Sequence, residues 1–222
     1  MNSAQSKKHK RYRLEYLAHD VAKIFAALPG LIWFRPKVMF ITPEARKKIY
    51  GGALLIANHT GYFDPIFMMF AIWYRRHRFI CLKELLETRF GWILRSFLCI
   101  PIDRENFSMD SFRVITNHLR NGELVSMFPE GHINDGSGNL RSFKSGMILM
   151  AVKSGAPIIP MYIKKREFCW QRLRMIIGEP VDVKKMYDER PSMTTIEGIT
   201  KLLYQKEEEL KKHIEEENTT CP

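Results

Sequence analysis

The stretch that decides the fold is Ala53-Leu54-Leu55-Ile56-Ala57-Asn58-His59-Thr60-Gly61-Tyr62-Phe63-Asp64-Pro65. Its first five residues are apolar and of strand length, and the apolar run of residues 66–73 is long enough for a short helix. We therefore expect His59 in the loop after a strand, and a helix that starts with Asp64 as its N-cap and Pro65 in its first turn. Ligands of open α/β sheets bind beyond the carboxyl ends of the strands. A histidine followed by a carboxylate at that edge is a candidate general base.

The same pair also has a purely structural interpretation. Asp64 would then only cap a helix, and His59 would only hydrogen-bond its own loop. The chain has 7 histidines, so an aspartate five residues after one of them is a weak motif when taken alone. The residues that follow the other predicted strands are therefore needed to distinguish the two interpretations.

The charge of the chain is unevenly placed. The net charge of the 222 residues is +11, and residues 1–50 hold eleven Lys or Arg against three acids, which is +8 of that total. A basic end suits an anionic surface, either lipid head groups or nucleic acid. The four cysteines are scattered without metal-ligand spacing or a disulfide framework. With no secretory signal either, we expect a reducing cytosol and no bound metal.

The N-terminal region predicts a membrane-associated segment. Residues 1–13 form a basic tail, and residues 14–40 form an amphipathic helical segment broken at Pro29-Gly30. The uncharged run of residues 24–34 is much shorter than the ~20 residues that span a bilayer. The segment therefore either lies in the membrane interface or packs on the core of its own domain. Its apolar residues recur at helical spacing: Leu14, Leu17, Val21, Ile24, Phe25 and Leu28.

From residue 38 onward, strand-like and helix-like segments alternate, which favours an α/β fold with much parallel pairing. We expect a single domain over residues 41–217, with a mixed, mostly parallel sheet flanked by helices and preceded by the amphipathic segment. The expected strands are 38–42, 53–57, 78–82, 98–102, 123–128, 157–163 and 173–177, and the expected helices are 65–74, 84–97 (one or two, around Gly91), 108–120, 143–154 and 193–217.

Other turns follow strands as the His59 turn does. Arg104 follows the strand at 98–102, and Glu130-Gly131 follows the strand at 123–128. If these strands are parallel, their turns open on the same edge of the sheet as His59 and Asp64. A fourth segment, Ala156-Pro157-Ile158-Ile159-Pro160, is a strand bracketed by prolines.

Four blocks in this order give the chain its family resemblance. They are Asn58-His59-x4-Asp64, Ile102-Asp103-Arg104, Phe128-Pro129-Glu130-Gly131 and Ala156-Pro157-Ile158-Ile159-Pro160. Together they resemble the glycerolipid acyltransferase family, whose best-known type is lysophosphatidic acid acyltransferase. The blocks cover residues 58–160, and each is weak alone, but four in order are a specific signal.

The resemblance implies a role for each block. His59 takes the proton of the acceptor hydroxyl as it attacks an acyl thioester, and Asp64 orients the imidazole. Asn58 belongs to the same block and is a candidate for substrate binding. Arg104 matches the phosphate-binding arginine of the family.

The third and fourth blocks bind the substrates. Glu130 and Gly131 match the block that helps to bind the acceptor, and Pro160 with its strand matches the block on the acyl-donor side. One departure stands out, because the family commonly continues this third block as Gly-Thr-Arg and this chain has Gly131-His132-Ile133. Arg141 or Lys144 can supply the missing charge, or the acceptor head group is not plain glycerol phosphate.

The expected function is transfer of a fatty acyl group from acyl-CoA or acyl carrier protein to lysophosphatidic acid, which yields phosphatidic acid for phospholipid biosynthesis. No cofactor is implied beyond this co-substrate. The enzyme would work on the cytoplasmic face of a membrane as a peripheral or monotopic protein on an anionic surface, without a nucleic-acid partner. Two alternatives stay open: the same fold acylating another lysolipid or an amino-acid lipid, and a non-catalytic basic module that binds membrane or nucleic acid.

Overall fold

The computed structural model describes residues 14–89, 91–103, 108–134, 140–168, 170–186 and 192–217. The predicted basic tail at residues 1–13 and Arg104 lie outside these residues. A seven-stranded sheet forms the centre of the domain, in the order β1-β7-β6-β2-β5-β3-β4. The strands are β1 Lys37–Phe40, β2 Ala53–Ala57, β3 His77–Leu82, β4 Ile100–Ile102, β5 Leu124–Met127, β6 Ile158–Ile163 and β7 Arg174–Ile177.

Most neighbouring strands of the sheet are parallel. β2 lies between β5 and β6 and is parallel to both, β3 is parallel to β5 and β4, and only the pair of β6 and β7 is antiparallel. The prediction of a mixed, mostly parallel sheet is therefore confirmed. The carboxyl ends of β6, β2, β5, β3 and β4 share one edge of the sheet, which we call the carboxyl edge. The opposite edge, where these strands begin, is the amino edge.

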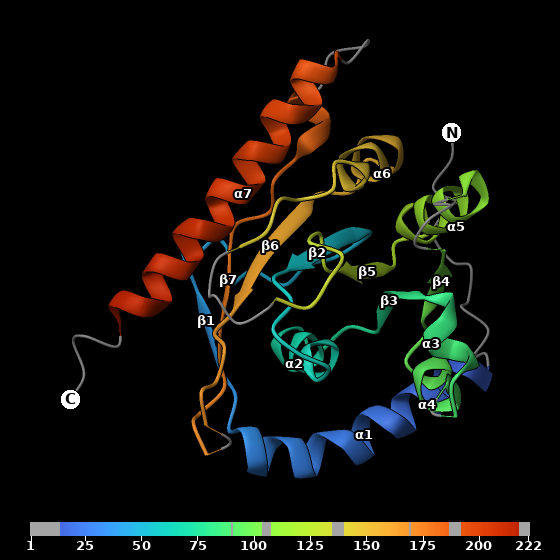
Figure 1. Ribbon diagram of the computed structural model, residues 1–222, viewed down its shortest axis with the longest axis vertical. Helices are drawn as coiled ribbons and strands as arrows, with labels where there is room; N and C mark the ends of the chain where they lie inside the picture. The colour runs from blue at the N-terminus through green and yellow to red at the C-terminus, as the bar shows by residue number, and fades with distance from the viewer. Residues whose placement is uncertain are drawn as a thin grey trace, which may run out of the picture.

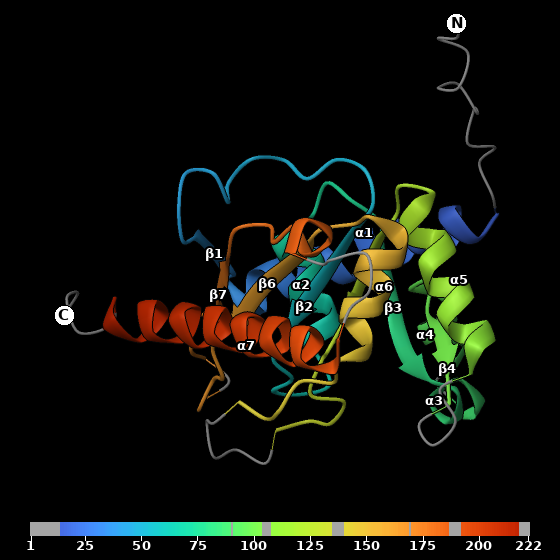
Figure 2. The same cartoon turned by 90° about the horizontal axis from the view of Figure 1, so that it is seen from above.

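Helices cover both faces of the sheet (Figure 1). The helices are α1 Leu14–Phe34, α2 Asp64–Ala71, α3 Lys83–Glu87, α4 Gly91–Ser96, α5 Met109–Arg120, α6 Gly146–Ser154 and α7 Met193–Glu216, with the 3-10 helix η1 at Val183–Met186. α2 lies between the sheet and α1, whereas α5, α6 and α7 cover the other face. Figure 2 shows α7 lying along β6 and β7 with α6 beside it.

The buried residues of β2 explain this layering. All five are completely buried, and the period-two alternation of a strand directs them to opposite faces. Leu55 packs in the cluster that contains α2, and Leu54 and Ile56 pack in the cluster that contains α5, α6 and α7. A strand buried on both faces is an unbroken apolar run, and the exact prediction of residues 53–57 rests on that feature.

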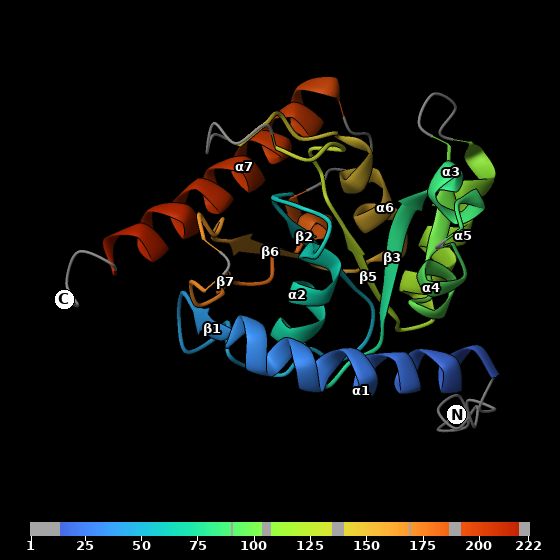
Figure 3. The same ribbon diagram turned by 60° about the horizontal axis from the view of Figure 1, so that its bottom comes forward.

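The prediction of a helix break at Pro29-Gly30 is wrong. α1 is continuous from Leu14 to Phe34 with Pro29 inside it, and Figure 3 shows it running beneath α2 from the side of α4 to the side of β1. A Cβ atom built on Gly30 would lie 2.6 Å from Cζ of Phe70, so Gly30 allows α1 to approach α2 closely. This packing explains why a Pro-Gly pair continues a helix here, although it lacks one backbone donor.

Candidate active site

The candidate site lies at the carboxyl edge, in the loops that follow β2 and β5. His59 and Asp64 belong to the β2–α2 loop and the first residue of α2, and Glu130 and Gly131 follow β5. β2 and β5 are parallel neighbours, so the expected convergence of these four residues is observed. β4 is parallel to the other strands of this edge and ends one residue before Asp103.

His59 and Asp64 form a hydrogen-bonded pair. Nδ1 of His59 lies 2.9 Å from Oδ2 of Asp64, the aspartate side chain is 1% exposed, and the histidine side chain is 18% exposed. A carboxylate on Nδ1 holds the proton on that nitrogen, which leaves Nε2 as the acceptor. The geometry thus provides an oriented imidazole whose other nitrogen can take a proton.

Asp64 is fixed by several further donors. The backbone N–H groups of Thr60 and Gly61 donate to Oδ2 at 2.5 and 2.8 Å, and the Thr60 hydroxyl donates to Oδ1 at 2.8 Å. The prediction that Asp64 caps the helix is wrong, because α2 starts at Asp64 and its N-cap residue, Phe63, makes no side-chain cap hydrogen bond. The carboxylate instead points back into the loop, where its hydrogen bonds shape the turn that presents His59.

Residues of the loop that follows β5 contact both the ring and the backbone of His59. The Phe128 ring stacks on the His59 ring, with 4.0 Å between centroids and 10° between planes. Oε1 of Glu130 accepts a hydrogen bond from the His59 backbone N–H at 3.3 Å, and the Asn134 N–H donates to the His59 carbonyl at 2.7 Å. Burial raises the pKa of Glu130, although the backbone N–H groups of Arg141 and His59 oppose that shift. Glu130 is thereby tied to the backbone that carries His59.

Gly131 and Lys144 are packed against each other. Gly131 has a φ of +71°, in the left-handed region that favours glycine, and a Cβ atom there would lie 3.0 Å from Cε of Lys144. The Lys144 and Arg141 side chains are both exposed beside this turn. They are the described basic residues nearest in sequence to Ile133, and their predicted role in phosphate binding stays a prediction.

Asn58 and Pro160 lie deeper in the sheet. The Asn58 side chain exchanges two hydrogen bonds with the backbone of Ile163, at 3.0 and 2.7 Å, and joins β2 to the end of β6. Pro160 is buried within β6, paired with Ile56, three residues before the strand ends. Their predicted roles in substrate binding remain predictions, since the described contacts of both residues are with the protein itself.

A cavity of about 150 Å³ adjoins the pair. Lys164, Lys165 and Arg166, which follow β6, line it together with Thr60, Gly61, Phe63, Asp64 and Phe67. The sequence analysis missed this basic run, and it missed Thr60 and Phe128 as well. The run Lys164-Lys165-Arg166 directly after a strand was a signal that could have placed it at the same edge. Among the residues that the structure describes, no three His, Cys, Asp or Glu side chains gather at a place that could hold a metal ion.

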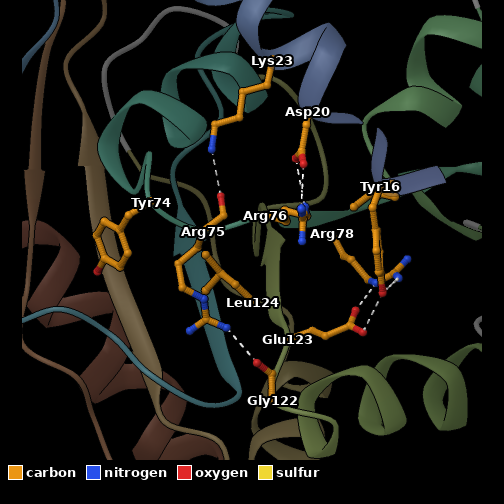
Figure 4. Close-up of a pocket in the computed structure, with 11 residues that line it drawn as sticks. Tyr16, Asp20, Lys23, Tyr74, Arg75, Arg76, Arg78, Gly122, Glu123 and Leu124 are labelled. Atoms are coloured by element: carbon orange, nitrogen blue, oxygen red, sulfur yellow. Dashed lines mark hydrogen bonds and ion pairs between the residues drawn. The ribbon is translucent and has the colours of Figure 1, made fainter. Parts of the chain in front are cut away.

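Another cavity lies at the amino edge, away from this pair. It has a volume of about 370 Å³, and residues of α1, of the segment before β3 and of the start of β5 line it (Figure 4). Its position beyond the amino ends of the strands separates it from His59 by the length of the sheet.

Comparisons with known proteins agree with the sequence blocks. Residues 37–164 match the family model described as Acyltransferase. A 1-acyl-sn-glycerol-3-phosphate acyltransferase of Streptococcus pneumoniae is 34% identical over 148 residues, which are 61% of this chain and 53% of that protein. The chain therefore spans about half the length of that relative. The enzyme of the same description from Bacillus subtilis is 26% identical over 74% of this chain and 84% of its own.

A solved structure shows the same fold. The 1-acyl-sn-glycerophosphate acyltransferase PlsC of Thermotoga maritima superposes with a TM-score of 0.64 over 92% of this chain and 81% of its own, at 23% identity. The family model covers more than half of this chain and contains His59, Asp64, Glu130 and Gly131. This chain belongs to the acyltransferase family.

Proposed function

We propose that this protein transfers a fatty acyl group from an acyl thioester to the free hydroxyl of lysophosphatidic acid, giving phosphatidic acid and a free thiol. The observation that carries the proposal is the His59–Asp64 pair, with a buried carboxylate on Nδ1 and a partly exposed ring. The names of the relatives, which are 1-acyl-sn-glycerol-3-phosphate acyltransferases, support the acceptor.

The chemistry needs no nucleophile from the protein. Nε2 of His59 removes the proton of the acceptor hydroxyl while its oxygen attacks the thioester carbonyl, and the Asp64 carboxylate stabilises the imidazolium that forms. When the tetrahedral intermediate collapses, the carbon–sulfur bond breaks and the imidazolium proton goes to the leaving thiolate. The Phe128 ring and the hydrogen bonds of the His59 backbone keep the imidazole plane fixed during this cycle.

The donor is the acyl thioester of CoA or of acyl carrier protein. In both donors a phosphate lies on the arm that ends in the thioester. The acceptor carries a phosphate as well, and the cations at the site suit such groups. Lys144 and Arg141 flank the Glu130 loop, and Lys164, Lys165 and Arg166 line the cavity beside Asp64. The Ile133 departure favours one second candidate, the same reaction with another lysolipid as acceptor.

Membrane association is part of the proposal. α1 exposes several large apolar side chains, and Phe168 and Trp170 of the β6–β7 connection are also exposed and stacked on each other. The Arg35 side chain donates to the Trp170 carbonyl at 2.7 Å, which ties this connection to the end of α1. Apolar and aromatic side chains with basic neighbours suit the interface of an anionic membrane, and we place the enzyme on its cytoplasmic face. Among the described helices, none is both long enough and apolar enough to cross a bilayer.

The test uses purified protein, vesicles, lysophosphatidic acid and an acyl-CoA, and follows both thiol release and phosphatidic acid. We expect turnover by the wild type and a loss of about 10²–10⁴-fold in His59→Ala, the usual contribution of a positioned general base. His213, an exposed histidine in the last turn of α7, provides the matched control variant His213→Ala.

Each result has a defined meaning. Near-normal turnover by His59→Ala would refute the assignment of the base. Thiol release that occurs only with another lysolipid would keep the reaction and move the acceptor to the second candidate. No turnover with any thioester or lysolipid would instead favour a non-catalytic membrane-binding module.

A further inference from the structure

The cavity at the amino edge is lined by ionic side chains from three parts of the chain. α1 contributes Tyr16, Asp20 and Lys23, and the turn before β5 contributes Glu123. Two arginines, Arg75 and Arg76, come from the segment that leads into β3, and Arg78 comes from β3 itself. Figure 4 shows these side chains converging from opposite sides of the cavity. The remaining lining residues are Tyr74, Leu98, Gly122 and Leu124.

Two of the cations are matched by the two carboxylates of the cavity. Arg76 donates to both oxygens of Asp20, at 2.9 and 2.6 Å. The Arg78 guanidinium is hydrogen-bonded to Glu123, which also lies 3.1 Å from Nδ1 of His118. These pairs tie α1 and β3 to the domain and neutralise the acidic charge of the cavity.

Lys23 and Arg75 are the other two cations, and their hydrogen bonds go to neutral oxygens. Lys23 donates to the carbonyls of Trp73 and Arg75, and its ammonium lies 4.6 Å from the centre of the Trp73 ring. Arg75 donates to the carbonyls of Ile49, Gly51 and Gly122. Burial lowers the pKa of both groups. Among the described residues that line the cavity, four cations stand against two carboxylates, and Asp20 and Glu123 also act on Lys23 and Arg75 over longer distances.

A half-buried excess of positive charge next to open space is a site for an anion, because burial of a charge without a counter-charge is unfavourable. The space of about 370 Å³ is large enough for a glycerophosphate group. The carbonyls that Lys23 and Arg75 contact are uncharged, so they do not offset the excess of two cations among the described lining residues. A phosphate monoester, with up to two negative charges, complements that charge.

We propose that this cavity binds the phosphate head group of an anionic phospholipid, at a site separate from the catalytic one. The inference goes beyond the proposed reaction, since it concerns the opposite edge of the sheet and needs no turnover.

The position of the cavity favours a lipid as the source of the phosphate. The residues of α1 that line it are spaced at i, i+4 and i+7, so they share one side of the helix. The neighbouring side of the same helical turns exposes Leu17, Val21, Ile24 and Phe25, at 48%, 43%, 58% and 76%. When this apolar side enters the acyl boundary, the cavity lies at the level of the head groups. Trp73 and Tyr74, each 46% exposed beside the cavity, suit the same interfacial zone.

The experiment measures binding of the full chain to vesicles in the absence of any acyl donor. The probes are vesicles of phosphatidylcholine alone, vesicles that also contain phosphatidic acid, and inorganic phosphate in solution. The test variant is Lys23→Gln, and Lys212→Gln, an exposed lysine of α7 on the other face of the sheet, is the charge-matched control. Lys23→Arg keeps the charge, and the thermal unfolding of each variant establishes that it is folded.

We expect Lys23→Gln to bind phosphatidic acid vesicles about five-fold more weakly than the wild type, the usual effect of one cation at an anionic surface. Lys212→Gln should have far less effect, Lys23→Arg should restore binding, and phosphatidylcholine vesicles should not distinguish the variants. An equal loss in Lys23→Gln and Lys212→Gln would overturn the site. Thermal stabilisation by inorganic phosphate that depends on Lys23, without any effect of Lys23 on vesicle binding, would overturn the lipid assignment.

The proposed reaction and the proposed lipid site can be tested independently of each other. His59→Ala should lose turnover and keep its binding to phosphatidic acid vesicles. Normal turnover together with vesicle binding that does not depend on Lys23 would refute only the second site.

Discussion

The two edges of the sheet differ in the ionisable side chains that they enclose. At the carboxyl edge the buried ionisable groups are acids, namely Asp64, Glu130 and Glu207. At the amino edge the described residues of the cavity include more cations than carboxylates, and Lys23 and Arg75 hydrogen-bond to backbone carbonyls. One edge therefore encloses carboxyl groups behind a histidine, and the other places cations beneath an amphipathic helix.

The ionisable groups of the two edges hold different parts of the molecule in place. The acids of the carboxyl edge are bonded to backbone N–H groups of the His59 loop, so they position one imidazole. The ion pairs of the amino edge join α1 to β3 and the turn before β5, so they position a helix. The two edges should consequently respond differently to substitution and with opposite sign to pH.

The largest expected effect is that of Asp64→Asn on turnover. An amide at position 64 keeps the shape but no longer holds a proton on Nδ1 of His59, and it gives the imidazolium no counter-charge. We expect kcat to fall by about 10²–10⁴-fold with the fold retained. Steady-state thiol release measures this, and Asp182→Asn, an exposed acid directly before η1, is the control. A kcat within a few-fold of the wild type would mean that Asp64 serves only the turn.

An amino-edge substitution should act on stability instead. Burial alone would raise the pKa of Glu123, but its hydrogen bonds with His118 and Arg78 outweigh burial and lower this pKa to about 2. A depressed folded-state pKa stabilises the protein above the unfolded value near 4.5, and this stability is lost as the pH falls toward 2. After allowance for solvent screening, we expect Glu123→Gln to lower the free energy of unfolding by about 2 kcal/mol at pH 7.

Urea unfolding at several pH values tests the Glu123 prediction. The difference between the wild type and Glu123→Gln should shrink as the pH falls below the unfolded pKa. A difference that does not change with pH would show that the charge of Glu123 is not the source of the stability. Glu44→Gln, an exposed acid of the β1–β2 connection, is the matched control.

Local patterns predicted most of the fold. The strands were found because uncharged apolar runs of strand length stand between turn residues, and the end of α6 at Gly155 was found because its φ of +74° suits glycine. The breaking signal of Pro29-Gly30 failed because the packing of Gly30 on Phe70 joins residues 40 positions apart. Local propensity has no access to such contacts.

The candidate site was predictable to the extent that it depends on strand order. Parallel strands bring the His59 and Glu130 loops to one edge, but the stacking of Phe128 on His59 joins residues 69 positions apart and leaves no local trace. The ionic cavity at the amino edge was missed for the same reason, since its residues come from α1, β3 and β5. Glu207 did leave a signal, because it interrupts the apolar stripe of Leu203, Leu210 and Ile214 on α7.

The smallest expected effect in the comparison of the two edges concerns Glu207. Its side chain is completely buried, and its carboxyl oxygens make no hydrogen bond among the described residues. Burial raises the pKa of Glu207 well above the ordinary value, and the charges of Glu130 and Glu208 act in the same direction. The nearby backbone N–H of Asn58 acts against this shift. Burial therefore favours the neutral form of Glu207 beneath the loop that carries His59.

A raised folded-state pKa stabilises the protein below the unfolded pKa, and this contribution is lost as the pH rises through the folded value. Glu207→Gln keeps the shape and cannot ionise, so at pH 5 it should unfold within about 1 kcal/mol of the wild type. As the pH increases, the variant should become progressively more stable than the wild type, which is the opposite of the acid-side loss expected at Glu123. Parallel slopes of the two proteins between pH 5 and 9 would mean that Glu207 ionises freely, and that the carboxyl edge holds its acids in water-like surroundings. Diverging slopes would establish that burial keeps Glu207 neutral, so that this acid adds no negative charge beneath the loop that carries His59.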